Sequence, residues 1–135
     1  MSGDGPTVIV VEDDAAHRHL LELCLETAGY RVRCASTARE AAALIGTEPT
    51  ADLLLTDYHL GSAEGTHLVM LVRQARPGMA CLVVTGQNGL EPWATEHGVP
   101  LLMKPYKVRD LIGMVASLVG PAAPVRQLPG LSRAG

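Results

Sequence analysis

Charged and hydroxyl side chains follow four apolar segments of this sequence, directly after each segment ends. Glu12 and Asp13 follow VIVV, Asp57 follows LLLT, Thr85 follows CLVV and Lys104 follows LLM. If these segments are parallel strands, their carboxyl ends lie at one edge of a sheet, where open α/β sheets bind ligands. The sequence therefore predicts three carboxylates, a hydroxyl and an ammonium group in one site.

Such a site has a definite chemistry. Carboxylates held close together repel one another and require a cation, a proton or a base as compensation. Carboxylate oxygens with open positions suit Mg²⁺, which also binds waters and phosphate oxygens. A hard cation, an ammonium group and a hydroxyl around one carboxylate are the groups that phosphoryl transfer requires. Asp57 is then the candidate nucleophile.

Each of these residues also has a simpler structural interpretation. Asp14 is expected to cap the first helix, and the neighbouring acidic residues can be its solvated entrance. Taken singly, Asp57 and Thr85 can be turn residues, and Lys104 can be an ordinary surface charge. Four independent accidents at four strand ends are improbable, so the combination favours a site.

The elements that must position these residues alternate along the chain. Strands are expected at 7–11, 31–35, 52–56, 80–84 and 100–103. Helices are expected at 15–28, 37–45, 68–75, 91–97 and 108–119, the second opening with a Thr37–Glu40 capping box. Four strands are continuous apolar runs, typical of burial on both faces, whereas RVRCA alternates like an edge strand. This order predicts a doubly wound α/β domain of five parallel strands, (βα)5.

Composition and charge exclude several classes of function. Eleven Lys and Arg against fourteen Asp and Glu leave a net charge of −3, which argues against a protein that neutralises nucleic-acid phosphates. No apolar run approaches the roughly 18 residues of a membrane span. The N-terminal MSGDGPT lacks the basic and apolar regions of a secretory signal. We expect neither a nucleic-acid partner nor a membrane partner.

The 135 residues, of which 47% are apolar, predict one packed domain. We expect an N-terminal extension at 1–6, the domain at 7–120 and a flexible, proline-rich tail at 121–135. The three cysteines are widely spaced and form no CxxC pair. They are interpreted as buried, reduced thiols, which places the protein in the cytoplasm.

Taken together, these segments strongly resemble the receiver domain of two-component response regulators, the family of the chemotaxis protein CheY. The resemblance covers about residues 7–119. It rests on VIVVEDD, GYRVRCASTAREAAALI, ADLLLTDYHLGSAEG, VVTG and LLMKPY. It implies a flavodoxin-like strand order of 2-1-3-4-5 and, for a chain of this length, a receiver without its own output domain.

The resemblance also implies the roles of the acidic residues. Asp57 would accept a phosphoryl group from a sensor histidine kinase or a histidine phosphotransfer protein. Asp13, Asp57 and the backbone carbonyl of His59 would bind Mg²⁺, and Glu12 would act on the ion mainly through ordered water. Hydrolysis at the same site would be slow, so the domain would reset itself without being a conventional enzyme.

The remaining implied roles concern the switch. Lys104 would pair with the phosphorylated aspartate, Thr85 would move to bond a phosphoryl oxygen, and the bond preceding Pro105 would be cis. The family commonly places an aromatic residue at the position of Leu101, so coupled movement of Thr85 and an aromatic ring is in doubt here. Tyr106 cannot be assumed to replace that ring.

The loop after Asp57 also departs from the family pattern. Leu60-Gly61 stands where Met-Pro is frequent and is expected to loosen the loop without removing a ligand. The His59 side chain can approach the phosphoryl group or point to solvent, and we favour solvent. The other histidines lack metal-ligand spacing and are interpreted as surface residues: His17, His19, His67 and His97.

Three functions follow from this reading. The first is a phosphorylation-switched receiver that acts through a downstream protein bound to its last two helices and last strand; homodimerisation through the last helices stays open. The second is a pseudo-receiver, a binding module that is never phosphorylated. The third is an aspartate-nucleophile phosphatase of the haloacid-dehalogenase type. Those enzymes typically carry a second aspartate where this chain has His59, and a cap insertion for which there is little room.

Overall fold

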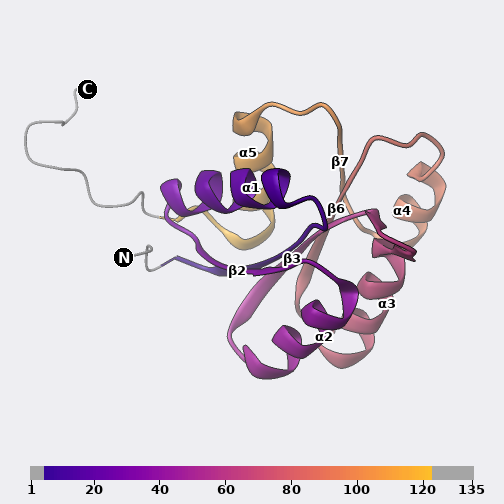
Figure 1. Ribbon diagram of the computed structural model, residues 1–135, viewed down its shortest axis with the longest axis horizontal. Helices are drawn as coiled ribbons and strands as arrows, with labels where there is room; N and C mark the ends of the chain where they lie inside the picture. The colour runs from indigo at the N-terminus through magenta and orange to yellow at the C-terminus, as the bar shows by residue number, and fades with distance from the viewer. Residues whose placement is uncertain (1–4, 123–135) are drawn as a thin grey trace, which may run out of the picture.

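A five-stranded parallel sheet forms the centre of residues 5–122, the part of the chain that the computed structural model describes (Figure 1). Its strands, from one edge to the other, are β2 (Arg31–Ala35), β1 (Thr7–Val11), β3 (Ala51–Asp57), β6 (Ala80–Thr85) and β7 (Leu101–Met103). In chain order this is 2-1-3-4-5, which confirms the predicted sheet and the edge position of RVRCA. Most of the expected extension and tail lies outside the described residues.

Five helices cover the two faces of the sheet, and each face has its own core (Figure 1). One face carries α1 (Ala15–Thr27) and α5 (Val108–Val119), and the other carries α2 (Ala38–Thr47), α3 (Gly65–Ala75) and α4 (Glu91–His97). Alternate residues of each central strand point into opposite cores, which explains why these strands are apolar at every position.

Local signals in the sequence begin and end the helices as expected. The Asp14 carboxylate accepts a hydrogen bond from the His17 N–H at 2.9 Å and caps α1. The Thr37 hydroxyl accepts from the Glu40 N–H at 3.0 Å and caps α2. Gly98, with a φ of 65°, ends α4 in the left-handed conformation that favours glycine.

The β7 strand and the loop after Asp57 differ in detail from the sequence prediction. β7 is the second edge strand, as the 2-1-3-4-5 order implies, and it faces both cores, with Leu101 against one and Leu102 in the other, but only Leu102 is fully buried. The loop after Asp57 contains an antiparallel pair that the sequence analysis did not predict, β4 (His59–Leu60) with β5 (Ala63–Glu64). The cysteine expectation held in part, since Cys81 is buried whereas the other two free thiols are half-buried.

The start of α3 lies unusually close to the end of β3. The Gly65 N–H donates to the Tyr58 carbonyl at 2.6 Å. A Cβ atom on Gly65 would collide with the Asp57 carbonyl oxygen and would lie 3.0 Å from Thr56 Oγ1. Because the collision involves backbone, no side-chain movement can relieve it, and glycine is required here. The backbone that carries Asp57 is thereby held against α3.

We predict that Gly65→Ala lowers the free energy of unfolding by about 1–3 kcal/mol, the usual cost of overpacking a tight site. Gly46→Ala is the matched control, because Gly46 is an exposed glycine in α2 with no atom within 4 Å of its would-be Cβ. That control should gain about 0.5–1 kcal/mol. Urea denaturation of both variants checks the prediction, and equal stability of the two would contradict it.

Candidate functional site

The strand register brings the predicted residues to one edge of the sheet. Asp57 pairs with Val84 across β3 and β6, and Thr85 pairs with Met103 across β6 and β7. The residues that follow the strands therefore share the carboxyl edge. The Lys104 N–H donates to the Thr85 carbonyl at 2.8 Å, which continues the parallel pairing one residue past β7.

Three acidic side chains gather at this edge. Each of Glu12, Asp13 and Asp57 has a carboxylate oxygen within 4.8 Å of such an oxygen in the other two. Glu12 is 2% exposed and Asp57 is 7% exposed, whereas Asp13 is open to solvent. Two buried carboxylates and one exposed carboxylate thus form a pocket of negative charge with one open side.

The two oxygens of the Asp57 carboxylate have different partners. Oδ1 lies 2.6 Å from Lys104 Nζ and has no other polar partner within residues 5–122. Oδ2 accepts a hydrogen bond from the His59 N–H at 3.1 Å. One oxygen is therefore held by the backbone, and the other faces an ammonium group alone.

Glu12 and Asp13 are also held by hydrogen bonds. Glu12 Oε2 accepts from the Asp14 N–H at 3.0 Å, and Asp13 Oδ2 accepts from the Gly61 N–H at 2.9 Å. Burial raises the pKa of Glu12 above its ordinary value of 4.5, and the negative charge of Asp57 adds to the rise. The amide of Asp14 and the ring of His17 act in the opposite direction.

His17 corrects the sequence analysis, which placed it on the surface. Its side chain is only 18% exposed. Nδ1 lies 2.5 Å from Glu12 Oε1, and Nε2 lies 2.6 Å from the Tyr106 hydroxyl. The first turn of α1 directs this ring over the end of β1 because Asp14 caps the helix immediately after the acidic pair. No motif spacing signals a contact between residues 89 positions apart.

On the opposite side of Asp57, Thr85 and His59 both contact Gln87, which the sequence analysis did not single out. The buried Thr85 hydroxyl accepts from the Gln87 N–H at 2.9 Å. The exposed His59 ring has its Nε2 3.0 Å from Gln87 Oε1. The His59 side chain is thus at the surface, as favoured, and is also tied to the loop after β6.

The residues around Lys104 complete the site. The bond between Lys104 and Pro105 is cis. Tyr106 packs against the core under α1 and α5, and burial, with the nearby Cys24, Glu12 and Asp57, raises its pKa to about 12. Tyr106 therefore lies on the α1 side of the sheet and contacts His17. Leu101, by contrast, packs against the other core.

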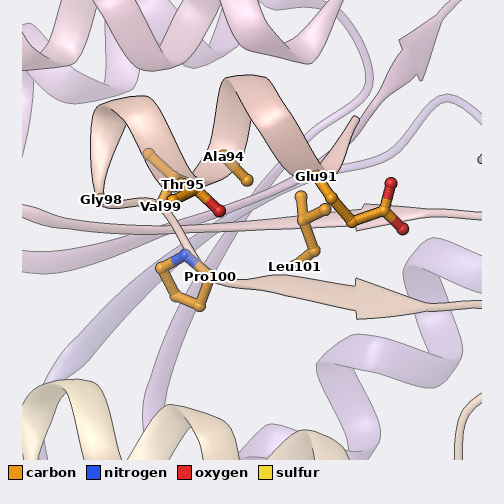
Figure 2. Close-up of a pocket in the computed structure, with 7 residues that line it drawn as sticks. All are labelled: Glu91, Ala94, Thr95, Gly98, Val99, Pro100 and Leu101. Carbon is orange, nitrogen blue, oxygen red and sulfur yellow. The ribbon is translucent and has the colours of Figure 1, made fainter. Parts of the chain in front are cut away.

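A separate hollow of about 380 Å³ lies between α4 and β7 (Figure 2). Leu101 extends from β7 toward α4 there, and Ala94 and Thr95 face it from the helix (Figure 2). None of the three clustered carboxylates, Glu12, Asp13 and Asp57, lines this hollow. It is a feature of the face formed by α4 and β7 and is distinct from the carboxylate cluster.

Comparison with known proteins places this geometry in a family. The family model described as the response regulator receiver domain matches residues 8–116. The chain belongs to this receiver family. Receiver domains bind Mg²⁺ in an acidic site, and this chain carries an acidic cluster at the carboxyl edge of its sheet.

Individual relatives agree with this assignment. The chain is 34% identical over 114 residues to the DNA-binding transcriptional regulator NtrC of Rhizobium meliloti (strain 1021), covering 82% of this chain and 23% of NtrC. It is 30% identical over 141 residues to the transcriptional regulatory protein AruR of Pseudomonas aeruginosa, covering 90% of this chain and 55% of AruR. The chain therefore spans between about a quarter and about half the length of these relatives.

Solved structures show the same fold. A CheY-like receiver domain protein from Methanospirillum hungatei JF-1 superposes with a TM-score of 0.78 at 34% identity, covering 84% of this chain and 93% of that one. A response regulator from Chloroflexus aurantiacus J-10-fl gives 0.76 at 30% identity, covering 86% and 98%. Among the described residues, no helix is both long and apolar enough to cross the bilayer.

The donor set fits a divalent cation. Carboxylate oxygens are the ligands that Mg²⁺ prefers, and the exposed side of Asp13 leaves room for the waters that this ion retains. Asp57 Oδ1 is buried, and among residues 5–122 its only polar partner is the lysine. A cation at this position would relieve the repulsion that burial imposes on the cluster.

We predict that Glu12→Gln stabilises the protein in metal-free buffer. A raised pKa means that the ionised carboxylate costs folding free energy at neutral pH, a cost that fades as the pH falls toward 4.5. Removing the charge should raise the free energy of unfolding by roughly 0.5–2 kcal/mol at pH 7 with EDTA present.

Glu96→Gln, at an exposed position of α4, is the matched control and should leave stability unchanged. Urea denaturation measures both variants. A Glu12→Gln protein less stable than wild type under these conditions would show that the Glu12 charge is already compensated without a cation.

Proposed function

We propose that this chain is a phosphorylation-switched receiver in a two-component phosphorelay, in which Asp57 accepts a phosphoryl group from the phosphohistidine of a sensor kinase or phosphotransfer protein. The observation that carries this proposal is the buried Asp57 Oδ1, 2.6 Å from Lys104 Nζ and beside two further carboxylates. Free cysteines suit a reducing compartment, and we place the protein in the cytoplasm.

The transfer step requires a nucleophile, charge compensation and no further side-chain chemistry. An Asp57 carboxylate oxygen attacks phosphorus, the phosphorus–nitrogen bond of the donor breaks, and its electron pair returns to the donor imidazole. The product is an acyl phosphate. The His59 N–H orients the carboxylate through Oδ2, and the Lys104 ammonium balances charge beside Oδ1.

We assign the metal site to Asp13, Asp57 and the backbone carbonyl of His59, with Glu12 acting mainly through ordered water. Bound Mg²⁺ would supply positive charge to the oxygens of the transferring phosphoryl group. The amides of Asp14 and Gly61 hold the Glu12 and Asp13 carboxylates in place. Backbone hydrogen bonds thus help to orient these two side chains.

Thr85 is the proposed reporter of phosphorylation. Its buried hydroxyl accepts from the Gln87 amide and therefore keeps its own hydrogen for an acceptor. A phosphoryl oxygen on Asp57 is such an acceptor, and movement of Thr85 toward it would break the contact with Gln87. The change would reach the face formed by α4, β7 and α5, where we place the downstream protein partner.

The first test is the intact mass of the protein after incubation with acetyl phosphate and Mg²⁺. Wild type should gain one phosphoryl group, and Asp57→Asn should gain none, because an amide is not a nucleophile toward phosphorus. Asp110→Asn is the control, since this exposed aspartate lies in the first turn of α5, outside the acidic cluster. EDTA should abolish the adduct.

The absence of an adduct has two explanations that a second measurement separates. Rapid hydrolysis would hide the adduct, but beryllofluoride would still bind at Asp57 and change the fluorescence of Trp93 or the amide shifts. If neither acetyl phosphate nor beryllofluoride modifies the protein, the receiver proposal is wrong, and the chain is a binding module. Turnover of a generic phosphate ester would instead indicate a phosphatase.

A further inference from the structure

The side chain of His17 links the carboxylate cluster to Tyr106 on the α1 and α5 side of the sheet. The ring of His17 stands between the Glu12 carboxylate, 2.5 Å from Nδ1, and the Tyr106 hydroxyl, 2.6 Å from Nε2. The two rings are tilted by 42° with their centres 5.8 Å apart. Two segments far apart in the sequence, residues 12–17 and Tyr106, thus meet in one chain of hydrogen bonds.

Both ring nitrogens of His17 are engaged, so the orientation of the ring is set from two sides. A neutral imidazole has one donor and one acceptor, and a tyrosine hydroxyl can serve as either. If Nδ1 donates to the Glu12 carboxylate, Nε2 accepts from Tyr106, and every polar group in the chain is satisfied. The Tyr106 hydroxyl thus provides the hydrogen-bond partner of the second ring nitrogen, Nε2.

Glu12 is consequently held at both carboxylate oxygens and at its backbone carbonyl. Oε1 faces His17, Oε2 accepts from the Asp14 N–H, and the Glu12 carbonyl accepts from Arg18 Nη1 at 2.9 Å. The side chain is almost fully buried and cannot take another rotamer without losing these partners. Its charge is therefore presented to the cluster in one direction.

Resting on the proposed function, we propose that His17, braced by Tyr106, is a positioning residue that holds the Glu12 carboxylate for Mg²⁺ and so raises the affinity of the acceptor site for this ion. Hydrogen-bond partners behind a metal site orient its ligands, and their loss typically costs about 10–100-fold in metal affinity. Neither His17 nor Tyr106 touches the reacting atoms.

A different role for His17 makes the opposite prediction. If the ring only supplied positive charge to offset the carboxylates, it would compete with the cation, and its removal would tighten Mg²⁺ binding. If it only packed α1 against the sheet, its removal would lower stability and leave Mg²⁺ affinity unchanged. The sign and size of the change in affinity therefore separate the three roles.

The experiment is calorimetric titration of the whole chain with Mg²⁺, with urea denaturation in EDTA as the second measurement. We expect His17→Leu to raise the Mg²⁺ dissociation constant by about 10-fold or more. Tyr106→Phe, which loses one oxygen atom, should raise it by a smaller factor. The double variant should bind as His17→Leu does, because both changes break the same chain.

His19→Leu is the matched control on α1, since that histidine is 70% exposed and lies outside the cluster. An unchanged or lower dissociation constant in both His17→Leu and Tyr106→Phe would overturn the inference. If His17→Leu fails to fold, Tyr106→Phe and His17→Gln decide the question. Wild type that binds no Mg²⁺ also overturns it, whereas wild type that binds Mg²⁺ without accepting phosphate overturns only the proposed function.

Discussion

Repulsion among three carboxylates at one edge of a sheet is the constraint on which the rest of this structure depends. Two of them are buried, where the low dielectric strengthens repulsion and removes the water that would screen it. One ammonium group, three backbone amides and one imidazole contact these carboxylates and partly offset their negative charge. Without a cation, this repulsion lowers the free energy of unfolding, and a ligand that supplies positive charge relieves it.

Strand order and close backbone packing position the groups that offset this charge. Placing β1, β3, β6 and β7 side by side brings their carboxyl ends together. Contact between α3 and the end of β3, for which Gly65 is needed, holds the backbone of Asp57 so that its carboxylate faces Lys104.

The features that could be predicted from the sequence are those that depend on local sequence pattern and on the geometry of parallel strands. The parallel sheet, the helix caps and the gathering of residues at the carboxyl edge follow from apolar periodicity, capping signals and the geometry of parallel strands, whereas the strand order was implied by the resemblance to the receiver family. Sequence reasoning missed contacts set by tertiary packing: His17 with Tyr106, Gln87 with His59, and the hairpin after Asp57. It also predicted full burial of the apolar run in β7, whereas Leu101 and Met103 are only partly buried because β7 is an edge strand.

Mg²⁺ is expected to offset the repulsion within the carboxylate cluster, and the free energy of unfolding as a function of Mg²⁺ concentration tests this most directly. We predict that wild type gains stability progressively, by about 2.7 kcal/mol when Mg²⁺ reaches about 100 times its dissociation constant. Asp13→Asn should weaken this response, and Asp110→Asn should leave it intact. A wild-type protein whose stability is the same at every Mg²⁺ concentration would contradict the account.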